Sequence, residues 1–130
     1  MKRGDKFSCS FEVSESIYRG FRDLFQDRNP LHTDAAFARE KGFEREVMFG
    51  NILNGYISYF VGQCLPIRNV LIHKQEIKYH HAVYLNDALT LCATVTEVFD
   101  SVNAVKMKYY FQNQDDKKVA KGKLQIGVLE

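Results

Sequence analysis

Hydrophobic and polar residues alternate near the start of the chain, from Phe7 to Val13. This period of two predicts a first β-strand with one buried face. Ser14 follows in the position of a helix N-cap. From Ile17 to Phe25 the apolar residues are spaced by three and four positions, which predicts a helix with one apolar face that ends near Gln26.

A polar, turn-forming segment comes next, from Asp27 to Pro30. It predicts a loop, because proline keeps the residue before it out of the α region and because Asp and Asn favour turns. Asp34 is then placed to cap a short helix from Ala35 to Lys41. Gly42 follows where a left-handed residue commonly closes a helix.

The most apolar stretch of the chain, Met48 to Leu65, keeps helical spacing and precedes Pro66. It predicts one long, largely buried helix. Gly50, Gly55 and Gly62 lie within this stretch. Because glycine inside a helix costs roughly 1 kcal/mol relative to alanine, we expect backbone or a ligand to approach the helix closely at these positions.

The remainder of the chain predicts four strands, at residues 70–83, 88–99, 103–112 and 118–129. Polar turn residues separate these strands, at Asn86-Asp87, Asp100-Ser101 and Asn113 to Asp116. Such breaks favour connections between neighbouring antiparallel strands. A long apolar helix followed by four strands indicates an α+β fold in which a sheet wraps around the helix.

Length and composition indicate one globular domain that spans residues 1–130, because a chain of this size builds one core but not two. Hydrophobic residues make up 45% and charged residues 26%, as in folded soluble proteins. The net charge of +2 is spread without a basic block, so no nucleic-acid partner is expected. Neither a secretory signal nor a membrane-spanning run is present, so we expect a cytoplasmic protein without a membrane partner.

Potential metal ligands are few. The three cysteines form an odd set without close spacing and are expected to be reduced, mostly buried thiols: Cys9, Cys64 and Cys92. His73, His80 and His81 lie on one predicted strand, where the first and last share a face and His80 points to the other. We therefore expect no metal site, and no cofactor.

The remaining candidate for chemistry is the segment from Asp27 to His32, since serine-hydrolase elbows and glycine-rich phosphate loops are absent. A carboxylate and an imidazole five residues apart, on a segment stiffened by Pro30, can both point at one water molecule and share its proton transfer. On spacing alone an equally good interpretation is that Asp27 is a turn residue and His32 a partly buried packing residue.

The segment from Gln26 to Asp34 resembles the MaoC-like, (R)-specific enoyl-CoA hydratase family through its Asp-x-Asn-Pro-x-His motif. The resemblance covers roughly residues 5–128. It includes Ala36-Phe37-Ala38, Gly42-Phe43, Phe49-Gly50, Leu65-Pro66, a strand that ends in Val83, the Asn86-Asp87 turn, Leu89-Thr90 and the strand from Thr94 to Val98.

This resemblance implies a hotdog fold, in which a curved antiparallel sheet wraps a long central helix, usually paired as a homodimer. Members of the family add water reversibly to trans-2-enoyl thioesters to give (R)-3-hydroxyacyl thioesters. By the resemblance, Asp27 and His32 hold the water, deprotonate it for attack at the β-carbon and deliver a proton to the α-carbon. The backbone N–H of Gly50 would face the thioester oxygen, a role that the positive end of a helix favours. The other residues expected to bind substrate are Asn29, Phe49, Asn54 and Gly55.

Three positions depart from the residues that are usual in this family: Gln26 replaces a glycine, Phe49 a histidine and Ala82 a proline. Phe49 is the largest change and suggests an altered substrate preference. Two other functions stay open: a hotdog acyl-thioesterase, which would direct water to the carbonyl carbon, and a non-catalytic subunit that binds acyl thioesters. The carrier of the acyl group, coenzyme A or an acyl carrier protein, is open too. An acidic carrier would need a basic patch such as Arg39, Lys41 and Arg45.

Overall fold

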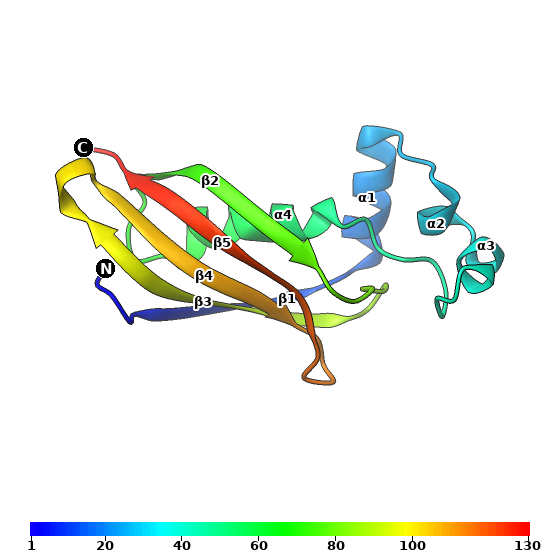
Figure 1. Ribbon diagram of the computed structural model, residues 1–130. Helices are drawn as coiled ribbons and strands as arrows, with labels where there is room; N and C mark the ends of the chain where they lie inside the picture. The colour runs from blue at the N-terminus through cyan, green and yellow to red at the C-terminus, as the bar shows by residue number, and fades with distance from the viewer.

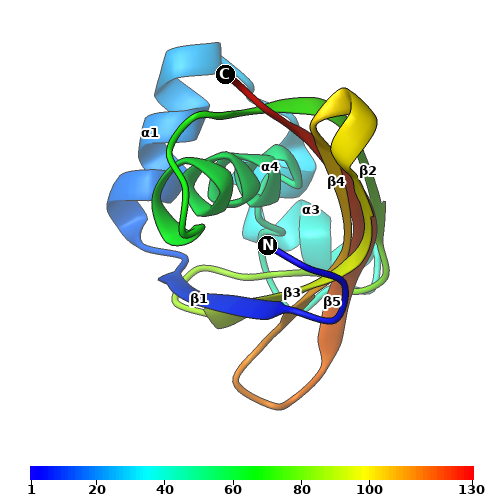
Figure 2. The same cartoon turned by 90° about the vertical axis from the view of Figure 1, so that its left-hand side faces the viewer.

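A curved antiparallel sheet of five strands wraps around a central helix in the computed structural model, which describes residues 1–130 (Figure 1). The strand order is β1-β3-β4-β5-β2, so β1 and β2 are the two edges of the sheet. Figure 2 shows the sheet curving around one side of α4, while α1 lies on the other side. The strands are β1 Lys6–Glu12, β2 Val70–Tyr79, β3 Ala88–Phe99, β4 Ala104–Gln112 and β5 Lys118–Val128.

The helical layer precedes the main run of strands, and both of its predicted caps are confirmed. The Ser14 hydroxyl accepts a hydrogen bond from the Ile17 N–H, and the Asp34 carboxylate accepts from the N–H groups of Ala36 and Phe37. Gly42 has the expected left-handed conformation, with φ +93°. The helices are α1 Glu15–Phe25, α2 Pro30–Thr33, α3 Ala35–Glu40, α4 Asn51–Tyr59, its π-helical continuation η1 Phe60–Cys64, and the 3₁₀ turn η2 Asp100–Val102.

The hydrophobic core lies between α4 and the concave face of the sheet. Leu53 and Ile57 of α4 and Phe60 of η1 are almost fully buried and share one core cluster with Met107 and Phe111 of β4. Burying a side chain of this size contributes roughly 1.5–3 kcal/mol. Buried and exposed residues alternate along β4, so the convex face of the sheet meets solvent. This packing fixes the position of α4 and therefore of its N-terminal end.

The central helix begins three residues later than predicted, and the loop predicted from Asp27 to Pro30 ends one residue earlier. Met48 is extended, because its N–H donates to the carbonyl of Val83 at 2.8 Å, and α4 begins at Asn51. Pro30 does not belong to a loop but occupies the first position of α2. Proline is tolerated there because the first N–H groups of a helix have no partner within it.

Strand β2 ends at Tyr79 rather than at Val83. The N–H groups of His80 and His81 both point at the carbonyl of Val119, at 2.8 and 3.1 Å, so the chain turns away from the regular ladder. The predicted alternation of three histidines along one strand is therefore wrong for His80 and His81, which lie beyond β2.

The turn at Asn86 and Asp87 was predicted to connect neighbouring strands, and this prediction is wrong. The turn joins β2 to β3, and β5 and β4 lie between these two strands in the sheet. The buried Asp87 carboxylate holds this crossing in place. It accepts hydrogen bonds from the Tyr84 N–H at 2.9 Å and from the Gln114 side chain at 3.0 Å. A connection between distant strands contains the same polar turn residues as a tight hairpin. The sequence pattern therefore could not distinguish the two.

Among the helix glycines only Gly50 is closely approached, and by a side chain rather than by the expected backbone or ligand. A Cβ atom there would lie 3.1 Å from Cε1 of Tyr79, whereas no atom lies within 4 Å of such a position at Gly55 or Gly62. Gly122, on β5, is more tightly enclosed, because a side chain there would overlap the Glu76 carbonyl.

The three cysteines are free, as predicted, but all are half-buried rather than mostly buried. The Sγ atoms of Cys9, on β1, and Cys64, at the end of η1, lie 2.7 Å apart. Burial, together with this contact, raises the pKa of the Cys9 thiol to about 11. At neutral pH this thiol is therefore protonated and unreactive.

Two further properties bear on the expected partners. None of the helices combines the length and apolar character needed to cross a bilayer. The structure also contains no group of three or more His, Cys, Asp or Glu side chains arranged to hold a metal ion.

We predict that Gly122→Ala destabilises the fold, by about 1–3 kcal/mol, because the methyl group would overlap the Glu76 carbonyl and the Tyr109 hydroxyl. The matched control is Gly20→Ala in α1, where no atom lies within 4 Å and helix propensity favours alanine by up to ~1 kcal/mol. Denaturant unfolding of both variants measures the difference. Equal stability of the two would contradict the enclosed position of Gly122.

Candidate active site

His32 lies on α2, a helix of one turn that local interactions define. The Asn29 side chain accepts from the Leu31 N–H at 3.0 Å and caps the helix, and Pro30 sets the backbone of the first residue. Asn29 was expected to bind substrate, and the structure places it as this cap. A four-residue helix is not stable alone, so other contacts must hold His32.

The His32 imidazole is held at two points. Its Nδ1 atom lies 2.7 Å from the backbone carbonyl oxygen of Val47. A carbonyl only accepts, so Nδ1 carries the proton and, in the neutral ring, Nε2 is left as a free acceptor. The ring also lies against the Phe49 ring, with centroids 4.4 Å apart and planes at 32°. Phe49 is 2% exposed, so its contact is with His32 and the core.

Asp27 lies just after α1, where Gln26 ends the helix in a left-handed conformation, with φ 58°. One carboxylate oxygen of Asp27 accepts from the Asn29 N–H at 3.1 Å and closes a turn. The other oxygen has no hydrogen-bond partner in the chain. Asp27 is thus a turn residue, as the alternative interpretation of the sequence held, and its second carboxylate oxygen is available for chemistry.

Asp27 and His32 line two different hollows. His32 lines one of about 330 Å³ together with Gly50, Tyr79 and Val83. Asp27 lines a larger one, of about 1020 Å³, between α1 and α4. The two residues form no hydrogen bond with each other, and the beginning of α4 contributes to both hollows: Gly50 to the first, Asn51 to the second.

The N-terminal end of α4 presents unpaired donors. The N–H groups of Gly50 and Asn51 have no hydrogen-bond acceptor in the chain. Gly50 is the only one of the two that shares a hollow with His32. An unpaired N–H at the positive end of a helix stabilises negative charge on a bound oxygen atom.

Asn54 and Gly55 lie along the hollow that Asp27 lines. The Asn54 amide donates to the Asn51 side chain at 2.7 Å and to the Tyr79 hydroxyl at 3.4 Å, and it accepts from the Gln75 side chain. Asn54 is thereby fixed by its own chain. Gly55 is exposed and leaves the wall of the hollow open.

Sequence reasoning missed Tyr18, Val47 and Tyr79. The Tyr18 hydroxyl donates to the His32 carbonyl, the Val47 carbonyl accepts from the His32 ring, and Tyr79 covers Gly50 from β2. A backbone carbonyl carries no residue preference, so no motif could have identified Val47. The apolar pattern around Tyr18 indicated a helix but not the partner of its hydroxyl.

Comparison with known proteins gives the class to which this fold and this site belong. A model of the family described as MaoC like domain matches residues 2–117. The (R)-specific enoyl-CoA hydratase of Aeromonas caviae is 32% identical over 93 residues, which cover 72% of this chain and 69% of that protein. A protein of the same name from Rhodospirillum rubrum is 30% identical, over 74% of this chain and 67% of the relative.

The solved structure of the A. caviae (R)-hydratase involved in PHA biosynthesis superposes with a TM-score of 0.90 at 25% identity, covering 99% of this chain and 98% of that one. The chain belongs to the MaoC-like domain family, and its fold is the hotdog fold expected from the sequence.

Proposed function

We propose that the protein is a hydro-lyase that reversibly adds water to trans-2-enoyl thioesters to give (R)-3-hydroxyacyl thioesters. The observation that carries this proposal is that His32, whose Nε2 is free, lines the same hollow as Gly50, whose N–H is unpaired. A proton acceptor and an oxyanion donor beside one cavity are what addition next to a thioester requires. The names of the two relatives support it.

The reaction follows from these groups. Asp27 and His32 hold one water molecule and remove its proton as its oxygen bonds to the β-carbon of the enoyl group. The electron pair of the double bond moves to the thioester, and the Gly50 N–H stabilises the resulting enolate oxygen. Return of the proton to the α-carbon completes the addition. This step places the water at the start of α4, because Gly50 lines the hollow of His32 and Asn51 lines the hollow of Asp27.

The acyl carrier is coenzyme A, the carrier in the names of both relatives. The residues considered for an acidic carrier protein are engaged within the chain. Arg39 donates to the Glu44 carbonyl at 3.2 Å, Arg45 lies over the Tyr84 ring at 4.9 Å, and Lys41 lies over the Phe37 ring at 5.3 Å. These contacts orient the three cations but leave them exposed and charged, so the proposal of coenzyme A rests on the names of the relatives.

The test is an absorbance assay at the enoyl-thioester band with coenzyme A substrates from crotonyl to longer chains, with thiol release followed in parallel. Loss of the enoyl band without free thiol is expected. Thiol release that accompanies substrate loss would select the thioesterase, and binding without turnover would select the non-catalytic subunit.

We predict that Asp27→Asn and His32→Gln each lower turnover by at least ~10²-fold, and that the double variant loses little more. Both side chains act on the same water, so removing either one disables the step. The controls are Asp23→Asn, an exposed carboxylate of α1, and His73→Gln on β2. Losses that multiply in the double variant, or near wild-type turnover in either single variant, would contradict a shared role.

Gly50→Ala is expected to keep the N–H but to lower turnover by about 10²-fold, because the methyl group occupies space next to the reacting oxygen. The same methyl would also press on the Tyr79 ring at 3.1 Å. Combining it with Tyr79→Leu separates these effects, since the smaller side chain relieves the contact. Turnover should stay low in the double variant. Full recovery would show that Gly50 acts only through Tyr79.

We further propose a homodimer. Ile17, Leu24 and Phe25 of α1 are 39%, 82% and 69% exposed, an apolar surface that a second copy would cover. Light scattering at micromolar concentration should give at least twice the chain mass of 15.1 kDa. A stable, fully active monomer would refute this expectation.

A further inference from the structure

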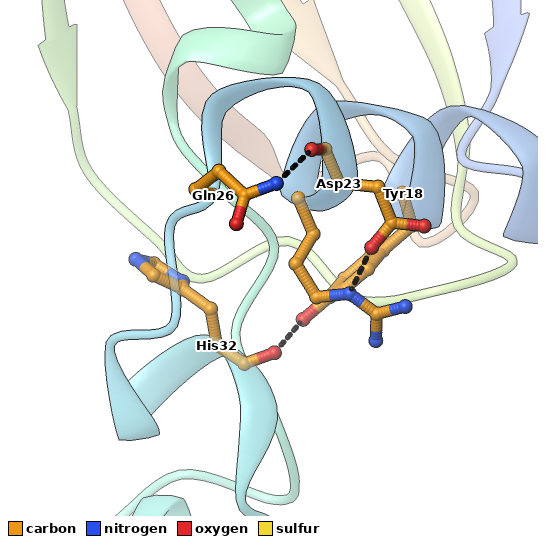
Figure 3. A network of polar contacts seen from close by, with 5 residues as sticks. Tyr18, Asp23, Gln26 and His32 are labelled. Carbon is orange, nitrogen blue, oxygen red and sulfur yellow. Dashed lines mark hydrogen bonds and ion pairs between the residues drawn. The ribbon is translucent and has the colours of Figure 1, made fainter.

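Tyr18 is a buried tyrosine of α1 whose hydroxyl reaches the segment that carries His32. The side chain is only 9% exposed. Its hydroxyl oxygen lies 2.6 Å from the backbone carbonyl oxygen of His32 and 3.1 Å from that of Val47. Figure 3 shows the hydroxyl meeting the His32 carbonyl while the imidazole points away from it.

The two carbonyls that Tyr18 contacts are the two that determine the position of the imidazole. The first belongs to the backbone of His32 itself, and the second, that of Val47, accepts the Nδ1 proton of the ring. Tyr18 thus joins α1 both to α2 and to the segment that leads into α4. No other side chain hydrogen-bonds to either carbonyl oxygen, apart from the imidazole itself.

The Tyr18 hydroxyl is a permanent donor. Burial, and the negative charge of Glu46, raise the pKa of Tyr18 to about 12, against the opposing effect of Arg22. Tyr18 also lines a small hollow, and the other charged groups that line it are Glu15, Arg19 and Arg45. The phenol therefore stays protonated near neutral pH and donates to the carbonyls.

The ring of Tyr18 has a separate packing role. It contacts the Phe49 ring with centroids 5.4 Å apart, and Phe49 in turn lies under His32. Phenylalanine at position 18 would keep this packing and remove only the hydroxyl. The contribution of the hydrogen bonds can therefore be separated from that of the aromatic cluster.

We propose that Tyr18 is a positioning residue, which holds the His32 backbone and the Val47 carbonyl so that Nδ1 keeps its proton and Nε2 remains the acceptor that faces the substrate. The proposal rests on the proposed function only for its effect on turnover. Its effect on the imidazole is a property of the protein without substrate.

The experiment compares Tyr18→Phe with Tyr109→Phe. Tyr109 is also buried, at 4% exposed, and its hydroxyl donates to the Glu76 carbonyl at the same 2.6 Å, but on the sheet and away from His32. Tyr18→Phe should lower kcat by about 10-fold with KM unchanged, as expected for the loss of a hydroxyl donor that orients a reacting group. Tyr109→Phe should keep the kcat of the wild type.

Nitrogen NMR of the His32 ring, without substrate, gives the second readout. The wild type should show the Nδ1-protonated neutral tautomer, and Tyr18→Phe should show a mixture of both tautomers. Wild-type kcat together with an unchanged tautomer in Tyr18→Phe would overturn the proposal. So would an Nε2-protonated ring in the wild type, even if Tyr18→Phe failed to fold. Absence of hydratase turnover in the wild type would refute the proposed function but leave the tautomer test intact.

Discussion

The hydrogen bond between Nδ1 of His32 and the carbonyl of Val47 is the interaction on which the site depends. Helix α2 has a single turn and cannot hold an imidazole in place by itself. The segment around Val47 is in turn tied to its surroundings, because the Val47 N–H donates to the Leu31 carbonyl at 3.0 Å and the Met48 N–H to the Val83 carbonyl at 2.8 Å. The short helix α2 is thereby anchored to the segment that joins β2 to β3.

The remainder of the fold holds both the His32 imidazole and the Gly50 N–H in place. Burial of α4 against the sheet determines where its N-terminal end lies, and this end carries the unpaired Gly50 N–H. Tyr79 from β2 closes over Gly50 and leaves little room for a side chain there. His32 of α2 and Gly50 at the start of α4 therefore line one hollow, although they belong to different helices. Electrostatic stabilisation of an enolate requires such fixed groups, because mobile dipoles would have to reorganise during the reaction.

Elements with a local cause could be predicted from the sequence, and contacts between distant segments could not. Strand β3 has the predicted bounds, Ala88–Phe99, because alternation along a strand is a local property, and Ser14 and Asp34 cap their helices for the same reason. Three features depend on partners far away in the chain: the end of β2, the crossing at Asn86 and Asp87, and the Tyr18 contact.

For the site, resemblance to a family identified Asp27, His32 and Gly50 as candidates. The Val47 carbonyl that orients His32 could not be predicted, because every residue type has a backbone carbonyl. Phe49 illustrates the difference: its departure from the family suggested a change in specificity, and the structure places its ring against the imidazole.

Addition of water to the β-carbon is the central claim, and the fate of the water oxygen tests it most directly. The protein is incubated with an enoyl-coenzyme A thioester in water labelled with heavy oxygen, and the products are analysed by mass spectrometry. The account predicts an intact thioester that carries the label in its 3-hydroxyl group. Label in a free carboxylate, with unlabelled thioester remaining, would show that water attacks the carbonyl carbon and would contradict it.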